Sequence, residues 1–572
     1  MKNRAVAAMF HDIAGMLEIM EESPFRINAY RRAARALEGL TEDVAVVAAR
    51  GALTEIPGVG PRIAEKITEF LATGTCAYYE ELRAHLPAGV TALMTVPEVG
   101  PKTALLLQQR LGISTVEELE LAARDGKIRS LPRMGAKTEE NILKGIAMLR
   151  RGSTRHPIGR VLPYASELLE VVRAVPEVKT LSLAGSLRRM KETVGDIDLL
   201  VAGGQADQVM DVFTGFPRVK QVLAKGLTKS SVVLDVGIQA DVRVVEPDGY
   251  GAALQYFTGS KDHNVKVRER AVRRGLKVNE YGVFAVPGDR RVGGATEAEV
   301  YEAVGLVWIP PEIREDQGEI ERAEHGSLPS LIKATELRGD LHVHTRWSDG
   351  TESAQEMATA AKALGYEYVA ITDHSQSLKF VGGVTVDELR DHATVVKRIA
   401  DKVGIAILIG TECDIKLDGT LDYPDDVLQE LDVVIASIHT RFRMSQEEMT
   451  DRLVRAMENP HVDIIGHPTG RLLERREAYE LDFERILETA HRTATALEIN
   501  ASPERLDLRD VYARMAKDRG VKLVINTDAH SHYELQNNMA FGIGVARRAW
   551  LEVTDAVNTF PLAQLRAYLD ER

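Results

Sequence analysis

Hydrophobic and polar positions follow three different patterns along this chain of 572 residues. Residues 1–150 show apolar positions at helical spacing between glycine and proline turns, which predicts a set of short helices. Between residues 180 and 244, short apolar runs flank polar turns, which predicts strands joined by turns and a short helix. From Glu336 onward, short apolar strands alternate with helical segments. The pattern predicts a multidomain α+β and α/β protein with a helical N-terminal part.

Three aspartates stand on the predicted strands of the middle part. Residues two apart on a strand face the same side, so Asp196 and Asp198 present their carboxylates together. Asp241 lies on another predicted strand, and three carboxylates converge if the two strands are neighbours. Such a pair alone is common on solvated strand edges, but the third aspartate favours a metal site. Two Mg²⁺ or Mn²⁺ ions roughly 3.5–4 Å apart would neutralise these acids and could serve phosphoryl transfer.

A Gly-Ser turn stands just upstream of the first two aspartates. Gly185 and Ser186 precede a predicted helix start, where backbone N–H groups can bind a phosphate. Arg188 or Arg189 adds positive charge there. Together with the acids, this pattern resembles the nucleotidyltransferases. A longer string, from Tyr256 through residue 282, narrows the resemblance to the family-X DNA polymerases, because it matches their thumb in register over more than twenty residues.

The resemblance implies a two-metal polymerase site with a dNTP as the substrate. Tyr256 and Phe257 would lie against the incoming sugar, Asn264 would reach the minor-groove edge of the new base pair, and Arg268 the template strand. Val194 departs from the family, because a small hydroxyl residue would help to bind phosphate there. The residues expected to hold the nucleotide are Gly185, Ser186, Arg189, Gly195, Tyr256, Phe257, Gly259, Asn264 and Arg268.

The N-terminal part contains a motif that resembles a helix-hairpin-helix, in which a Gly-x-Gly turn opens a helix that can bind a DNA phosphate without reading sequence. Gly58 and Gly60 form the complete copy. A second copy, at Gly100 and Lys102, has Glu98 in place of the first glycine, and a third, at Gly135, has Arg133 there. A simple turn between helices explains any single copy. The set of three favours DNA-backbone binding at Gly58, Gly60, Gly100, Lys102 and Gly135.

Residues 28–34 and 58–74 together resemble the deoxyribose-phosphate lyase domain of the family. Lys66 falls at the position of the lysine that forms a Schiff base in that domain. A lysine forms an imine only when it is neutral, and Arg26 and Arg62 are the neighbouring cations that could lower its pKa. The alternative is a solvated helix lysine beside Glu65. Both interpretations stay open.

The pattern of the C-terminal part predicts seven strand–helix units, with polar residues at the strand ends. A barrel that resembles a TIM barrel would bring these residues to one face. Imidazoles mixed with carboxylates suit Mn²⁺, Zn²⁺ or Fe²⁺, which can activate a water for phosphoester hydrolysis. The order of residues resembles the PHP (polymerase and histidinol phosphatase) phosphoesterases, whose distorted (β/α)7 barrel binds up to three ions, here expected to be Mn²⁺ or Zn²⁺. The expected ligands are His342, His344, Asp349, His374, Glu412, His439, His467, Asp528 and His530.

By this resemblance each metal has its own ligand set. His342, His344, Glu412 and Asp528 would hold one ion. Asp349, His374 and His530 would hold a second, and His439 and His467 a third that Glu412 bridges. His461 precedes its strand and is not expected to be a ligand, and Asn500 is expected to be a supporting residue.

Composition limits the class of protein. The chain is 44% hydrophobic and 27% charged, as in ordinary globular proteins, and its two cysteines indicate no disulfide framework. Its net charge of −13 comes from the last part: residues 331–572 hold 29 basic and 41 acidic residues, whereas 151–300 hold 22 and 18. Nucleic acid is therefore permitted as a partner of the first two parts. With no signal peptide or membrane span predicted, we expect a cytoplasmic monomer.

The two resemblances cover nearly the whole chain, and their order resembles the bacterial and archaeal family-X DNA polymerases with a C-terminal PHP domain. We therefore expect an enzyme that fills short gaps during DNA repair and carries a 3′→5′ exonuclease, with AP endonuclease or 3′-phosphatase activity as further options. Its partners would be gapped or nicked duplexes, primer termini and dNTPs. The expected domains are 1–85 lyase-like, 86–150 fingers-like, 151–245 palm, 246–315 thumb, 316–335 linker and 336–572 PHP.

Three alternatives remain at this point. The polymerase core could be an inactive DNA-binding platform for the PHP nuclease, which Val194 alone supports. An end-bridging protein without catalysis would leave nine ligand-type residues unexplained. A small-molecule phosphatase fits only the last third of the chain.

Overall fold

The computed structural model describes residues 3–20, 22–38, 44–56, 58–84, 86–87, 89–94, 96, 99–131, 134–150 and 155–570. The chain forms two compact units, Met1–Thr154 and Arg155–Arg572. Each unit has its own hydrophobic core.

The first unit is helical, as predicted. Glycines start its helices at the predicted motifs: Gly60 precedes Pro61 at the start of α4, and Gly100 precedes Pro101 at the start of α7. A proline suits the first helical turn because its missing N–H would have no partner there. The described helices are α1 (Asn3–Ile19), α2 (Pro24–Glu38), α3 (Val44–Ala49), α4 (Pro61–Thr73), α5 (Ala77–Ala84), α6 (Val90–Leu93), α7 (Pro101–Leu111), α8 (Val116–Arg124) and α9 (Ala136–Arg150).

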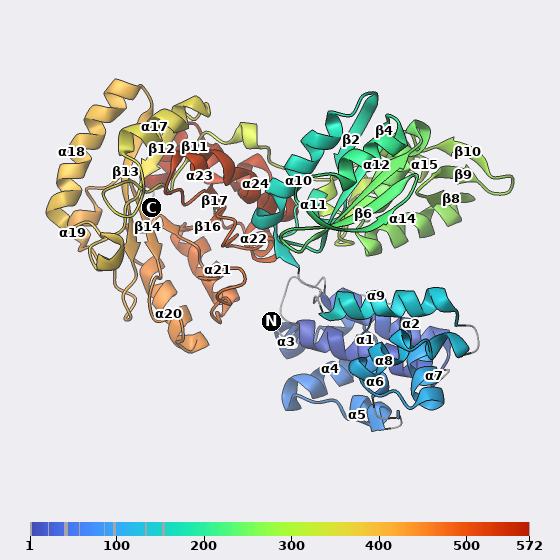
Figure 1. Ribbon diagram of the computed structural model, residues 1–572. Helices are drawn as coiled ribbons and strands as arrows, with labels where there is room; N and C mark the ends of the chain where they lie inside the picture. The colour runs from blue at the N-terminus through green and yellow to red at the C-terminus, as the bar shows by residue number, and fades with distance from the viewer. Residues whose placement is uncertain are drawn as a thin grey trace. The chain divides into compact units, whose positions relative to one another are not determined.

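The second unit begins with a mixed five-stranded sheet, the central sheet, of which Figure 1 labels β2, β4 and β6. Its strand order is β2-β4-β7-β6-β5. Strands β4 and β7 are parallel, and the other pairs are antiparallel. Buried side chains of α10 and α12, including Leu168 and Phe213, share its core. The elements are β1 (His156–Pro157), α10 (Ile158–Arg173), β2 (Val178–Leu183), α11 (Gly185–Arg188), β3 (Thr193–Val194), β4 (Asp196–Gly203), α12 (Ala206–Thr214), β5 (Val219–Lys225), β6 (Lys229–Leu234) and β7 (Gln239–Val245).

A smaller helix-and-sheet region follows, around a core that includes Val267, Val283 and Tyr301. Its three strands pair in the order β10-β9-β8. The segment predicted as a linker, 316–335, includes a helix and buries Ile320 and Ile332. The elements are α13 (Tyr250–Thr258), α14 (Lys261–Arg273), β8 (Leu276–Asn279), β9 (Gly282–Ala285), β10 (Arg290–Gly293), α15 (Glu297–Ala303) and α16 (Glu319–Glu324).

The C-terminal part confirms the predicted seven-stranded barrel, with all neighbouring strands parallel. A bridge between Val343 and Ala529 joins the ends of the first and last strands. Helices surround the strands (Figure 1). The strands are β11 (Gly339–Asp340), β12 (Tyr368–Ile371), β13 (Ala406–Asp414), β14 (Val433–Ser437), β15 (Ile464–Ile465), β16 (Ala496–Asn500) and β17 (Leu523–Asn526). The helices are α17 (Ala354–Ala363), α18 (Val386–Val403), α19 (Asp425–Leu428), α20 (Gln446–Met457), α21 (Phe483–Thr493), α22 (Asp510–Asp518), α23 (His532–Asn537), α24 (Met539–Arg548) and α25 (Leu562–Asp570).

Candidate metal centres

The carboxyl ends of the barrel strands bring together the nine predicted ligands. In parallel strands these ends meet at one face of the barrel. Among the described residues, three groups place their ligand atoms within 4.8 Å of one another. The groups are His342, His344, Glu412 and Asp528; His344, Asp349, His374 and His530; and His374, Glu412 and His439.

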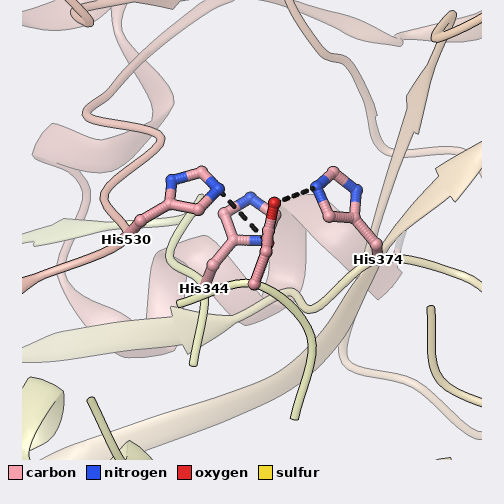
Figure 2. A group of neighbouring side chains, drawn as sticks. His344, His374 and His530 are labelled. Atoms are coloured by element: carbon pink, nitrogen blue, oxygen red, sulfur yellow. Dashed lines mark ion pairs between the residues drawn. The ribbon is translucent and has the colours of Figure 1, made fainter. Parts of the chain in front are cut away.

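One of these groups surrounds Asp349. Its two carboxylate oxygens lie 3.3 Å from His530 Nε2 and 3.5 Å from His374 Nε2. Figure 2 shows His344 between His374 and His530, and its ring centroid lies 4.5 Å and 4.3 Å from theirs. Three imidazoles and one carboxylate thus converge on one point, with His344 added to the three ligands expected there.

Glu412 lies at the centre of the other two groups and is 1% exposed. One carboxylate oxygen lies 2.8 Å from His467 Nε2 and 3.1 Å from His439 Nε2, and the other lies 2.9 Å from His374 Nδ1. A carboxylate with imidazoles on both oxygens has the geometry of a bridging ligand.

The chemistry of this cluster fits divalent metal ions. Buried nitrogens of His342, His344 and His374 lie 2.9–3.6 Å from a Glu412 oxygen without forming a well-aligned hydrogen bond, which is costly for polar atoms unless they bind something. Burial lowers the pKa of His374, but Glu412 and Asp349 raise it to about 10, so a proton balances the carboxylates. A bound cation would replace such protons, because metal ligation requires neutral imidazoles.

Two of the candidate ligands have strained backbones. The φ angles of His467 and Asp528 are 29° and 53°, in the left-handed region that residues with a Cβ rarely adopt. Such strain costs on the order of 1–3 kcal/mol and persists where function requires one side-chain direction.

Supporting residues that the sequence did not indicate surround the ligands. Glu498, fully buried on β16, accepts a hydrogen bond from the His467 backbone N–H at 2.7 Å and lies 2.7 Å from His342 Nδ1. This contact turns His342 Nε2 toward the site. Asp414 contacts His439 Nδ1 at 3.2 Å in the same way. The sequence feature that could have indicated Glu498 is an acidic residue inside an otherwise apolar strand.

Asn500, expected as a supporting residue, donates to Asp528 at 3.0 Å. His461 lies in none of the ligand groups.

The central sheet places the three predicted aspartates together. Asp198 on β4 is directly opposite Asp241 on β7, which confirms that the two strands are neighbours. Burial, followed by Asp196 and Asp241, raises the pKa of Asp198 to about 7. The Asp241 carboxylate lies 3.0 Å from Lys229 Nζ and accepts a hydrogen bond from Gln239. Carboxylates that repel one another in this way would gain from bound cations.

The turn before β4 approaches these acids closely. A Cβ on Gly185, whose φ is 63°, would lie 2.7 Å from an Asp198 oxygen. Glycine therefore allows the backbone of α11 to lie against the carboxylates. Ser186 lies in the same turn of helix, Gly195 directly precedes β4, and Val194 is fully buried.

The two arginines after this turn have different partners. Arg188 forms two hydrogen bonds with Glu297, at 2.7 and 2.8 Å, so its guanidinium is already paired with a carboxylate. Arg189 Nε donates to Glu315 at 3.0 Å, and Nη1 donates to the Thr258 carbonyl. Glu297 and Thr258 occupy both terminal nitrogens of Arg188, whereas the hydrogen bonds of Arg189 described here leave Nη2 available, so Arg189 is the better placed of the two to bind a phosphate.

The predicted nucleotide residues of the next region lie around the end of α13. Phe257 packs under Arg243, which is two residues from Asp241. Asn264 donates to the Tyr256 carbonyl at 2.7 Å. Gly259 follows α13. Arg268 lies on α14.

The first unit holds the predicted lyase and hairpin residues. Lys66 Nζ lies 4.6 Å from the ring centroid of Tyr78, and Arg26 donates to the Tyr78 hydroxyl at 2.7 Å. Gly58 has a φ of 84°, and Gly135 directly precedes α9. Glu98, Arg133 and the side chain of Lys102 lie outside the described residues.

Family models match four stretches of this chain. They are a helix-hairpin-helix domain over residues 1–76, a SAM-like helix-hairpin-helix tandem over 90–147, a DNA polymerase beta thumb over 253–315 and a PHP domain over 340–502. The PHP match ends before Asp528 and His530, which the fold nevertheless brings to the other ligands. Among the described residues no helix combines the length and the apolar character needed to cross a membrane.

One known protein resembles the whole chain, and others resemble about a third of it. A DNA polymerase/3′-5′ exonuclease PolX of Bacillus subtilis is 39% identical over 572 residues, which cover 100% of this chain and 99% of that protein. A probable phosphatase of Caldanaerobacter subterraneus is 33% identical over 34% of this chain and 77% of its own length. A probable phosphatase of Shewanella sediminis is 33% identical over 34% and 79%. The match to the full-length relative thus extends over the central sheet, the barrel and the first unit alike.

Proposed function

This chain belongs to the family-X DNA polymerases that carry a C-terminal PHP domain, and we propose that it extends DNA primers at the central sheet and removes 3′-terminal nucleotides at the barrel. The observation that carries this proposal is the presence of two separate acid clusters in one chain. One consists of aspartates on adjacent strands, and the other of imidazoles and carboxylates at the ends of six of the seven barrel strands. We propose short gaps in damaged DNA as the substrate, with AP endonuclease or 3′-phosphatase activity as further reactions of the barrel.

At the polymerase site, Asp196, Asp198 and Asp241 would hold two Mg²⁺ or Mn²⁺ ions, which stabilise the charge that develops during phosphoryl transfer. Asp241 is the residue proposed to accept the primer 3′-hydroxyl proton. Gly185, Ser186, Arg189 and Gly195 would hold the dNTP phosphates. Tyr256, Phe257, Gly259, Asn264 and Arg268 would contact the sugar, the new base pair and the template.

At the barrel, the nine ligands would hold Mn²⁺ or Zn²⁺ ions, up to three, which would supply an activated water. Buried His342 and His344 would exclude bulk water, and Glu498 would keep the His342 tautomer that leaves Nε2 available. Gly58, Gly60, Gly100, Lys102 and Gly135 would bind the DNA backbone. Because the substrate is DNA, we expect the enzyme to act in the cytoplasm. We also expect it to be a monomer.

The proposal is tested on a one-nucleotide-gapped duplex with Mn²⁺, following primer extension and primer shortening. The proteins are the parent, Asp196→Ala with Asp198→Ala, and His342→Ala with His344→Ala. We expect the first double variant to lose only extension and the second only shortening. If the parent shortens but never extends primers, the central sheet is a binding platform and the polymerase proposal is wrong.

A lyase activity in the first unit is a second candidate, favoured by the convergence of Arg26 and Lys66 on one tyrosine ring. Borohydride trapping of the parent on a cleaved abasic site should give a covalent adduct that Lys66→Ala does not form. An equal yield of adduct from Lys66→Ala would rule out this role.

A further inference from the structure

Helix α24 of the barrel packs against the turn that follows α11 of the central sheet. Gly544 faces Met190 so closely that a Cβ there would lie 2.7 Å from the Met190 side chain. Arg548, the last residue of α24, therefore enters the space beside Arg189, and its side chain is only 5% exposed. A buried guanidinium needs a partner for each of its charged donors.

Arg548 connects residues of both domains. Its Nε donates to Asp510 of the barrel at 2.8 Å, and its Nη1 donates to the carboxylate of Glu315 at 3.0 Å. The same Nη1 lies 3.0 Å from the backbone carbonyl of Arg189, to which it also donates. Arg548 thus holds both the main chain of Arg189 and the acid that binds the Arg189 side chain.

Glu315 is the acid shared by the two arginines. Its Oε1 accepts hydrogen bonds from Arg189 Nε and Arg548 Nη1, each at 3.0 Å, and lies 3.7 Å from Lys191 Nζ. Burial alone would raise its pKa, but Arg548, Arg189 and Lys191 lower it to about 2. The carboxylate is therefore charged at neutral pH and fixed from two sides.

The remaining contacts of Arg189 fix the direction of its guanidinium. Nη1 donates to the Thr258 carbonyl, and a Cβ on Gly259 would lie 3.1 Å from Nη1. Nε is occupied by Glu315. The guanidinium plane is therefore set by two contacts, and Arg548 supports one of them from the other domain.

We propose that Arg548, a barrel residue, is a positioning residue for DNA synthesis: it fixes Glu315 and the Arg189 backbone, and so holds the Arg189 guanidinium where the dNTP phosphates bind. This inference rests on the proposed polymerase function. It gives the barrel a second role, independent of its metal ligands, as the support of the nucleotide site.

The test measures KM and kcat for a single dNTP on a gapped duplex. Arg548→Ala should raise KM about tenfold and change kcat little, because the lost contact positions a ground-state phosphate ligand. Arg548→Lys should give an intermediate KM, since lysine keeps the charge but cannot bridge two carboxylates. Exonuclease activity should stay at the parental level in both, which also shows that the barrel is folded.

A matched control and a double variant separate positioning from general loosening of the domains. Arg547 lies on the same helix and pairs with Glu312 at 2.8 Å, without contacting Glu315 or Arg189, so Arg547→Ala should keep the parental KM. If Arg548 acts through Arg189, adding Arg548→Ala to Arg189→Ala should not raise KM further.

Two outcomes would overturn the inference. One is an equal rise of KM in Arg547→Ala and Arg548→Ala, and the other is a parental KM in Arg548→Ala. A parent that does not extend primers would instead refute the proposed polymerase function, and this inference with it.

Discussion

The two acid clusters of this molecule are built in opposite ways. In the central sheet, three carboxylates stand on two strands, Asp196 is exposed, and the acids repel one another. In the barrel, imidazoles alternate with carboxylates, His342 and His344 are fully buried, and Glu412 raises the pKa of His374 despite burial, so opposite charges attract there. The first arrangement would be neutralised by cations that a substrate also helps to bind, as is usual for Mg²⁺. The second offers most of its candidate ligands from the protein itself. The difference predicts that a substitution of an acid has opposite effects on the metal-free protein at the two sites.

The largest effect is expected for Glu412→Gln in the barrel. Because Glu412 contacts His374, His439 and His467, its loss should reduce primer shortening by more than about 100-fold, beyond the usual cost of removing a supporting residue of a metal. It should also lower the melting temperature of the metal-free protein, since breaking a buried ion pair is strongly destabilising. Primer extension is the control and should persist. Parental shortening activity in this variant would exclude Glu412 as a ligand.

A smaller effect is expected for Glu498→Gln, because Glu498 supports ligands without being one. Loss of such a partner costs roughly 10–100-fold in metal affinity or activity. The measurement is bound metal by elemental analysis, together with primer shortening. Glu504→Gln, an exposed acid in the following loop, is the matched control. A variant that binds metal as tightly as the parent would refute the supporting role.

The smallest effect is expected for Asp198→Asn in the central sheet. Unlike Glu412→Gln, this variant should stabilise the metal-free protein at neutral pH. The folded pKa of Asp198 is raised from 3.8 to about 7, so the folded state holds the proton more tightly than the unfolded chain. The free energy of unfolding therefore falls as pH rises from about 4 to 7. The loss is about 1.4 kcal/mol per pH unit, or a few kcal/mol in total.

This prediction is checked by melting in EDTA at pH 5 and pH 8. The melting temperature of the second unit should fall less between these values in Asp198→Asn than in the parent. Asp207→Asn, on the exposed face of α12, should behave like the parent. An identical fall in all three proteins would contradict the expected repulsion.

The grouping of the candidate barrel ligands could be predicted from the sequence because most of them stand just beyond a short apolar strand. A parallel barrel brings strand ends together whatever its loops contain, so the local pattern was sufficient. Glu498 was missed because it lies inside an apolar strand, where the pattern gives no sign of its long-range contacts with His342 and His467.

Local sequence patterns likewise could not predict ion pairs between residues that are far apart in the chain. The choice between Arg188 and Arg189 depends on Glu297 and Glu315, which are more than one hundred residues away. In the same way, prolines and charges between 316 and 335 concealed that Ile320 and Ile332 are buried. Tertiary packing decided both cases.

The bridge between Val343 and Ala529 has a consequence for the order in which the protein becomes competent during its synthesis. The first and last strands of the barrel must both exist before the ligand set is complete, and His530 stands near the end of the chain. The aspartates of the central sheet, by contrast, have all left the ribosome some 290 residues earlier. A nascent chain therefore carries the three aspartates of the central sheet well before it can assemble the nine candidate ligands of the barrel.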